Sequence, residues 1–430
     1  MINIQALLER FRSSLFFKPA LYVLGALVVA HGMLFADSVV NGEALPAYLR
    51  STVDSARAML STIAGAIITV AAVVFSITVV SVQLASSQFS PRILRGFLRD
   101  RKNQAVLGFV MGTFTYCLLI LRAVRSPGEN GEEAVIPNLS VAVGLLLAVL
   151  TALAILAFID HSARSMQVGE LINRIADEAI EQIRRLPRTE GPPEPEPPEE
   201  SEEGTPIPAR QRGWIQQVDS GRVLASLQPG ATFRQVVRTG HFVSEGTPLG
   251  FVSPAPADVD ELAEALDEHF QYGPERTMQE DIEFGMRQIV DVALRALSPG
   301  VNDPTSAYEV IVHLNAMLIE LFQRDLPPRV VPGEEGRRIL RLNELTHPEL
   351  LGRAFDQIRI IGARQPAVAI MLLRSLGVLR SEIERAELEH RLPPVDEQAR
   401  LVLEVCRRAD PLPEDMQRVE AAAASGGFEV

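Results

Sequence analysis

The chain has 430 residues, 54 Asp and Glu against 41 Lys and Arg, and only two cysteines. The length suits a membrane domain with one or two further domains, and the acidic, aromatic-poor composition argues against nucleic acid, which binds basic surfaces. The sequence holds no Cys-x-x-Cys pair and no zinc spacing among its seven His, so we expect no metal site, no cofactor and no disulfide framework.

Four apolar segments reach or approach the roughly 20 residues that cross a hydrocarbon core. They predict a four-helix transmembrane domain over residues 1–160, with spans at about 17–36, 58–85, 104–122 and 138–160. The first segment could be a signal peptide, but three more apolar segments follow it, so we expect an uncleaved span. The third is the weakest, because it is short and ends directly at an Arg; its alternative is a half-buried helix.

Basic residues set the orientation of these spans. Lys and Arg gather before the first span, between the second and third, and after the fourth, and all three segments fall on one side if there are four spans. We therefore expect a multi-pass protein of a bacterial inner (plasma) membrane, with the lipid bilayer as its partner. Both the N- and the C-terminus are then cytoplasmic.

The rest of the chain predicts a mostly helical region that contains a small all-β unit. Residues 161–186 continue an apolar helical period and predict a cytoplasmic helical extension of the fourth span. A flexible Pro/Glu-rich linker follows at 187–208, then short strand-forming runs with frequent Gly at 209–255. An α-helical domain is expected over 256–412 and a disordered tail over 413–430.

Within this region, seven helices are predicted, at 257–271, 277–297, 304–323, 334–344, 347–362, 366–389 and 394–407. In the β unit, residues 238–249 contain the pattern Gly-x-x-Val-x-x-Gly-x-Pro-Leu, which resembles a turn of lipoyl and biotinyl modules. The Lys that such modules carry is absent. The resemblance therefore implies a barrel-sandwich-like architecture and no cofactor.

The second span carries a stripe of polar residues. Thr62, Thr69, Ser76 and Gln83 are seven residues apart, or two helical turns, and lie near one line on the helix. Such a stripe can line a water-filled path, can form a contact face between helices, or can bond the carbonyls of its own helix. No span has a central charged residue, which argues against a proton-coupled pump and leaves a channel open.

Two other features could bind a partner. Arg92, Arg95 and Arg99 lie in a basic, amphipathic loop after span two, which suits the anionic inner leaflet or the inner mouth of a pore, or is an orientation signal alone. A second group surrounds a predicted helix start and is either an anion or ligand site or a tight structural turn. Its members are Asn302, Asp303, Thr305 and Ser306.

Three stretches together resemble one bacterial family. They are residues 75–92, beginning Phe-Ser-Ile-Thr-Val-Val-Ser-Val-Gln, the 238–249 turn, and residues 281–307. The chain is similar in them to the uncharacterised predicted-membrane-protein family catalogued as domain of unknown function 2254. The resemblance covers nearly the whole chain and implies an inner-membrane location with four spans. It implies no activity, so it assigns no functional residue.

The leading hypothesis is a homo-oligomeric channel or pore-like protein, with span two lining the path for a small ion and the cytoplasmic region sensing or gating. The alternative is a membrane-anchored scaffold or sensor that transports nothing and whose cytoplasmic domains bind a partner or small ligand. No nucleotide-binding loop, hydrolase or zinc-protease motif occurs in the sequence, so we do not expect an enzyme.

Overall fold

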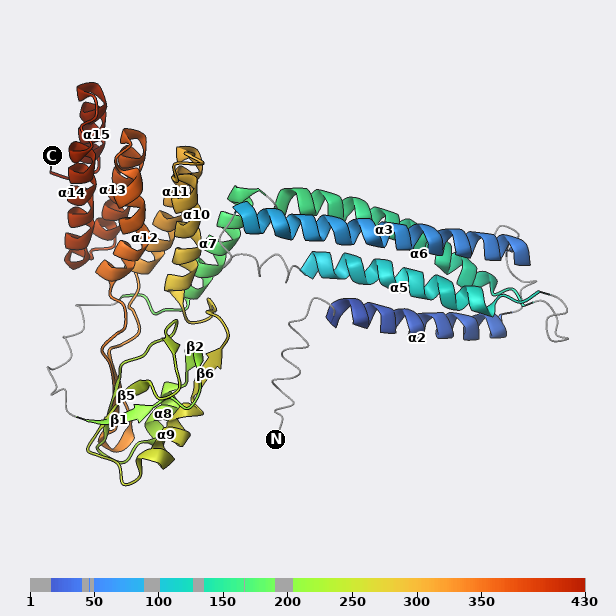
Figure 1. Cartoon of the computed structure of the whole chain (residues 1–430), viewed down its shortest axis with the longest axis horizontal. Helices are drawn as coiled ribbons and strands as arrows, with labels where there is room; N and C mark the ends of the chain where they lie inside the picture. The colour runs from blue at the N-terminus through green and yellow to red at the C-terminus, as the bar shows by residue number, and fades with distance from the viewer. Residues whose placement is uncertain are drawn as a thin grey trace. The chain divides into compact units, whose positions relative to one another are not determined.

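The computed structural model describes residues 17–40, 46, 50–88, 101–126, 135–165, 167–189 and 204–429, without the side chains of 84–88, 101 and 165. The chain divides into two compact units, Met1–Gln167 and Val168–Val430. We refer to them as the N-terminal and the C-terminal unit and describe each by itself (Figure 1).

The N-terminal unit contains four long apolar helices among its described residues, as the sequence predicts. They are α2 (Phe17–Val39), α3 (Val53–Gln88), α5 (Arg101–Ala123) and α6 (Asn138–Ser165). Each is long and apolar enough to cross a membrane. The backbone of such a helix satisfies its own hydrogen bonds, which is what a lipid environment requires.

The third predicted span, the weakest in the sequence, is the most buried of the four. In α5, 44% of the apolar window is buried inside the unit, against 11–22% in the other three helices. Its neighbours are α2, α3 and α6. Because other helices surround it, α5 can carry buried polar side chains such as Gln104 and Thr113.

Two glycines one turn apart allow α5 to approach α2 closely. A Cβ at Gly108 would lie 2.7 Å from Cδ2 of Tyr22 and 3.0 Å from Cα of Pro19. A Cβ at Gly112 would lie 3.2 Å from the Tyr22 carbonyl oxygen. This Gly-x-x-x-Gly spacing is a common device for tight packing between membrane helices.

We predict that Gly108→Leu destabilises the helix bundle. The added side chain has no space against Tyr22, and overpacking of this kind costs about 1–3 kcal/mol. Gly32→Leu is the matched control, since a Cβ at Gly32 meets nothing within 4 Å. Thermal unfolding in mild detergent should show a lower midpoint for the first variant and an unchanged one for the second; equal midpoints would contradict this packing.

The C-terminal unit begins with two small sheets and their helices. The larger sheet has the order β1-β5-β3-β8-β7 and the smaller β4-β2-β6. The strands are β1 (Thr205–Pro208), β2 (Gly213–Val218), β3 (Thr232–Gln235), β4 (Phe242–Val243), β5 (Pro248–Ser253), β6 (Phe270–Gly273), β7 (Val330–Pro332) and β8 (Arg338–Arg341). Helices α8 (Ser220–Ser226) and α9 (Val259–Asp267) join their apolar core, which contains Phe233, Leu249 and Leu266.

This β region differs from the predicted all-β unit at 209–255. It contains two helices, it extends from residue 205 to 273, and it receives β7 and β8 from a later part of the chain. Strand β8 pairs in parallel with β3. The 238–249 turn does form as its glycines suggest, with positive φ angles at Gly240 and Gly246. The barrel-sandwich architecture is not confirmed.

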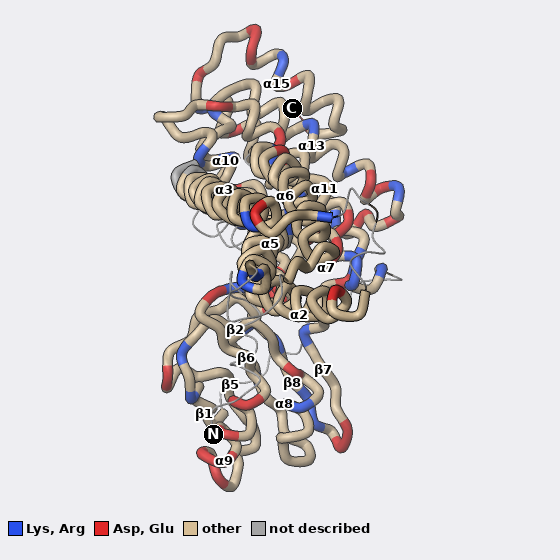
Figure 2. The backbone as a smooth tube through the Cα atoms, turned by 90° about the vertical axis from the view of Figure 1, so that its right-hand side faces the viewer, with Lys and Arg blue, Asp and Glu red and all other residues tan. Residues whose placement is uncertain are grey.

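The remaining described helices lie side by side beyond the sheets (Figure 1). They are α7 (Val168–Arg184), α10 (Ile282–Ala296), α11 (Pro304–Phe322), α12 (His347–Gly362), α13 (Pro366–Arg385), α14 (Pro393–Arg408) and α15 (Pro413–Ser425). Acidic and basic residues are spread over the C-terminal unit (Figure 2).

The predicted helix at 334–344 is wrong: a short 3-10 turn, Glu334–Gly336, precedes β8 there. Its strand residues pair with β3 and β7.

The predicted disorder of the tail is wrong. The tail at 413–430 contains α15, which packs on α13 and buries Val419 and Ala423. A close approach between Gly377 and Gly426 permits this packing, since a Cβ at Gly377 would lie 2.7 Å from Cα of Gly426. The predicted linker at 187–208 is anchored at both ends: Thr189 bonds residues after α11, and β1 pairs with β5. Residues 190–203 lie outside the described residues.

The extension of the fourth span is not one continuous helix. Helix α6 ends at Ser165, and α7 begins separately at Val168. The apolar period that suggested an extension instead forms the buried face of α7, with Ile172, Ile175 and Ile183. This face lies against α10 and α11, so α7 belongs to the C-terminal unit.

A half-buried histidine stabilises the end of α11. Nε2 of His347 lies 3.3 Å from the carbonyl oxygen of Leu321 and 3.0 Å from that of Arg324, so it donates to them as the Nε2–H tautomer. The ring packs edge-on against Phe322. Burial, and then the positive charge of Arg391, lower the pKa of His347 to about 4.

We predict a pH-dependent loss of stability through His347. The unfolded chain binds a proton below a pKa of about 6.5, and the folded chain does not until about 4, so stability falls by up to about 3 kcal/mol as pH drops through this window. His347→Gln should flatten the dependence between pH 6.5 and 5, measured by unfolding of the full chain. His390→Gln, at an exposed residue, is the control and should leave the pH dependence of stability as it is in the wild type. An unchanged pH dependence in His347→Gln would show that His347 is not its cause.

Candidate functional site

The polar stripe of the second span lies on an exposed face of α3. Thr62, Thr69, Ser76 and Gln83 are all exposed. The buried residues of this helix are on another face and contact α5 and α6; they include Leu60, Ala64, Ile67, Ala71 and Val74. The stripe is therefore not the face through which α3 packs within one chain.

Small residues separate the polar ones along this stripe. Gly65, Ala66 and Ala72 are exposed, and a Cβ at Gly65 would meet nothing within 4 Å. The Thr69 hydroxyl donates to the carbonyl oxygen of Gly65, 3.1 Å away, and its lone pairs can still accept. The side chains of Thr62, Ser76 and Gln83 make no hydrogen bond to any residue that the structure describes. The stripe thus has free donors, free acceptors and room for a close neighbour.

One end of the helix bundle is fixed by polar contacts that the sequence did not reveal. The carboxylate of Asp37, at the end of α2, accepts 2.9 Å hydrogen bonds from the backbone N–H groups of Leu139 and Ser140. It thereby caps the start of α6, where a negative charge is favourable. Arg57 of α3 donates to the carbonyl oxygen of Val124 and to the hydroxyl of Ser126, after α5. These contacts join α2 to α6, and α3 to the residues after α5, at this end of the bundle.

Arg92, Arg95 and Arg99 lie outside the described residues. Their assignment to an inner mouth or a lipid surface stays a prediction.

The turn at Asn302, Asp303, Thr305 and Ser306 starts α11. The carboxylate of Asp303 accepts from the backbone N–H groups of Thr305 (3.0 Å) and Ser306 (3.2 Å) and from the Ser306 hydroxyl (2.6 Å). The bonds from Ser306 lower the pKa of Asp303. Asn302 has a φ of +48° and accepts from the Gln365 amide. The position where an outside anion would bind is therefore already held by Asp303.

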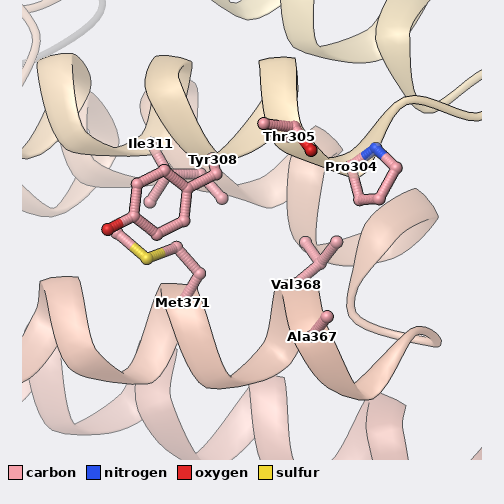
Figure 3. Close-up of a pocket in the computed structure, with 7 residues that line it drawn as sticks. All are labelled: Pro304, Thr305, Tyr308, Ile311, Ala367, Val368 and Met371. Atoms are coloured by element: carbon pink, nitrogen blue, oxygen red, sulfur yellow. The ribbon is translucent and has the colours of Figure 1, made fainter.

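A shallow apolar groove of about 380 Å³ lies next to this turn, between α11 and α13 (Figure 3). Tyr308 and Met371 face each other from the two helices, and Pro304 and Thr305 lie toward the other end. The lining is completed by Ile311, Ala367 and Val368. Such a surface suits apolar contact and offers few polar groups for orientation.

The other two family-like motifs meet in a buried ion network. Arg238, from the 238–249 turn, donates to Glu283 of α10 at 2.8 Å. Arg276 donates to Asp281 at 2.7 and 2.9 Å and to Glu283 at 3.1 Å. The four side chains are only 1–16% exposed. Gly240 is required here, because a Cβ would lie 2.3 Å from Oδ2 of Asp281.

A third guanidinium, from the half-exposed Arg353, lies 3.4 Å from Glu283, so three guanidinium groups face two carboxylates. Burial would raise the pKa of Glu283, but Arg238 and Arg276 outweigh it and hold this pKa below its ordinary value. Burial dominates at Asp281 and raises its pKa. With each charge partnered, the network has no free nucleophile or base; it fixes the turn at 238–240 to the start of α10.

We predict that Glu283→Gln destabilises the folded chain, because it leaves two arginines short of a buried partner. Breaking a buried pair costs about 3–5 kcal/mol. Since the pKa of Glu283 is lowered on folding, its contribution is present above a pH of about 4.3 and lost as pH falls through the folded-state pKa. Chemical unfolding at pH 7 and at low pH should show a difference from wild type that shrinks on acidification.

The matched control is Glu181→Gln, at an exposed pair with Arg185. Pairs of that kind contribute about 0–1 kcal/mol. An equal effect of the two substitutions would show that the network contributes no more than a surface contact.

Among the described residues, no group of three or more His, Cys, Asp or Glu side chains could hold a metal ion.

Most of the residues described above lie in a region that matches a known protein family. Residues 12–377, which contain both the stripe and the ion network, match the family described as predicted membrane protein (DUF2254). The chain is 34% identical over 344 residues to the uncharacterized protein Rv1290c of Mycobacterium tuberculosis, and equally to the uncharacterized protein Mb1321c of Mycobacterium bovis. The alignment covers 77% of this chain and 64% of each relative, so the chain spans less than two thirds of their length. No solved structure matches. The chain belongs to the predicted-membrane-protein family DUF2254.

Proposed function

We propose that this protein is a homo-oligomeric channel of a bacterial inner membrane, with α3 lining the path and the C-terminal unit acting on it from the cytoplasm. The observation that carries the proposal is the exposed polar stripe on α3. The same helix buries an apolar face within its own chain, so the stripe is available to other copies.

The physical reason is the cost of polar groups in lipid. A polar group without a partner in hydrocarbon costs several kcal/mol. Thr69 is satisfied by its own helix, but Ser76 and the Gln83 amide have no partner among the described residues. Contact between copies, or water in a path between them, would satisfy these groups. Gly65 and Ala72 lack bulk and would let neighbouring helices approach.

The chemistry of the stripe suits a small ion. From Ala58 to Gln83, α3 contains no charged residue. Hydroxyl and amide oxygens can replace part of the hydration shell of an ion without holding it so tightly that it cannot leave.

The second candidate function is a membrane-anchored sensor or scaffold without transport. The apolar groove between α11 and α13 favours it, because Tyr308 and the nearby Val312 are exposed and can contact a partner. The two candidates differ in one measurable property, which is passage of ions.

Current measurements on purified protein in planar bilayers test the proposal. We expect ion current from the wild type, and a large reduction from Ser76→Leu combined with Gln83→Leu, since both substitutions remove polar lining. Ile68→Leu combined with Phe75→Leu is the matched control: both residues are exposed on α3 but lie about a quarter turn from the stripe.

The control should conduct like the wild type. Absence of current from the wild type under all ionic conditions would favour the sensor. Full current from the Ser76 and Gln83 variant would show that α3 does not line the path.

A further inference from the structure

The C-terminal unit follows the last membrane helix almost immediately. Helix α6 ends at Ser165 and α7 begins at Val168, so only residues 166 and 167 separate the two helices. Three successive Cα–Cα steps span at most about 11 Å. A connection this short cannot absorb a large displacement of α7 without moving the end of α6.

Helix α7 is packed into the C-terminal unit along its length. Its buried face consists of Leu171, Ile172, Ile175, Ala176, Ala179 and Ile183. Gly285 of α10 leaves space for this face, since a Cβ there would lie 3.1 Å from Cβ of Ala179. Near the start of α7, Gly169 lies against the Glu309 side chain of α11. Helices α7 and α11 therefore run side by side in the same direction.

The far end of α7 is held by charged and backbone contacts. The Arg324 guanidinium, 9% exposed, donates to the carbonyl oxygens of Arg184 (3.3 Å) and Leu186 (3.0 Å). These carbonyls end α7 and carry partial negative charge, which a cation stabilises. Arg184 and Arg324 also both pair with Glu320 of α11.

The chain stays attached to the unit beyond α7. Thr189 donates its N–H to the carbonyl oxygen of Gln323 and its hydroxyl to Asp325. The Asp325 carboxylate also accepts from Arg391 at 3.0 Å. The Pro/Glu-rich segment therefore starts and ends within one unit, because β1 pairs with β5.

We infer that the C-terminal unit regulates the membrane path through α7, and that the Pro/Glu-rich segment has no part in this connection. Movement of α10 and α11 carries α7 with it and pulls on the end of α6. This inference rests on the proposed channel function for what is regulated, and on the packing of α7 for how.

The attachment is tested without any current. A protease recognition sequence is inserted between residues 196 and 197 of the full chain and cleaved in isolated membranes. The piece that begins at residue 197 should stay on the membrane, because α7 holds it. The same sequence inserted between 166 and 167 should release the C-terminal unit on cleavage. Release from the 196/197 site at the rate of the 166/167 site would overturn the inference.

Arg324→Gln refines this test. It removes the cation at the end of α7 and should speed release after cleavage at 196/197 by several-fold. Arg374→Gln, at an exposed residue of α13, should leave the rate unchanged. Equal rates in both variants would show that Arg324 does not hold α7.

Regulation is tested by two matched insertions in bilayer recordings. Gly-Gly-Ser-Gly between 166 and 167 should change the open probability several-fold, and the same insertion between 196 and 197 should not. Two wild-type-like insertions in a conducting protein would overturn the regulatory role of α7. No current from the wild type would instead overturn the proposed channel function and, with it, the regulation of the path. The cleavage test would still decide whether α7 holds the C-terminal unit on the membrane.

Discussion

Polar side chains in a hydrocarbon environment need hydrogen-bond partners, and this constraint acts most strongly on α3. Helix α3 buries an apolar face against α5 and α6 and leaves Thr62, Thr69, Ser76 and Gln83 exposed on another. A single chain therefore leaves its longest apolar helix incompletely satisfied. In the proposed channel, contacts between copies around a water-filled path would satisfy these groups, because they would supply hydrogen-bond partners and use the small residues between the polar ones for close approach.

The same bundle is fixed at one end and connected to a second unit at the other. Asp37 joins the end of α2 to the start of α6, and Arg57 joins α3 to the residues after α5. At the opposite end of α6, two residues lead to α7, which is packed on α10 and α11. In the proposed channel, a fixed outer end and a movable inner end would confine opening to the cytoplasmic side. The buried network of Arg238 and Glu283 would keep the β region and helices moving together.

The sequence predicted the membrane helices well, because each needs about 20 apolar residues in a row whatever its neighbours are. It missed features that depend on tertiary contacts. Residues 413–430 look polar, yet α15 forms because α13 covers its small apolar face. The helix expected at 334–344 is partly strand, since β3 and β7 supply its hydrogen bonds. Short segments of this kind take the conformation that their neighbours stabilise.

The candidate sites divide in the same way, into features that a local sequence pattern reveals and features that depend on tertiary contacts. The stripe on α3 is visible in the sequence, because a seven-residue period maps directly to one helix face. Its exposure is not, since the same period would suit an internal contact. The network of Arg276, Asp281 and Glu283 with Arg238 joins residues up to 45 positions apart, and nothing local marks them as partners. Gly108 and Gly112 were detectable by their spacing alone.

Disulfide crosslinking between copies tests the central claim most directly. In a variant without Cys117 and Cys406, single cysteines are placed at Thr69, Ser76 or the exposed Leu153 of α6, and native membranes are oxidised. The account predicts crosslinked dimers from the first two positions and far fewer from Leu153. Monomers from both Thr69→Cys and Ser76→Cys, with efficient crosslinking at Leu153, would place another helix between the copies and contradict the account.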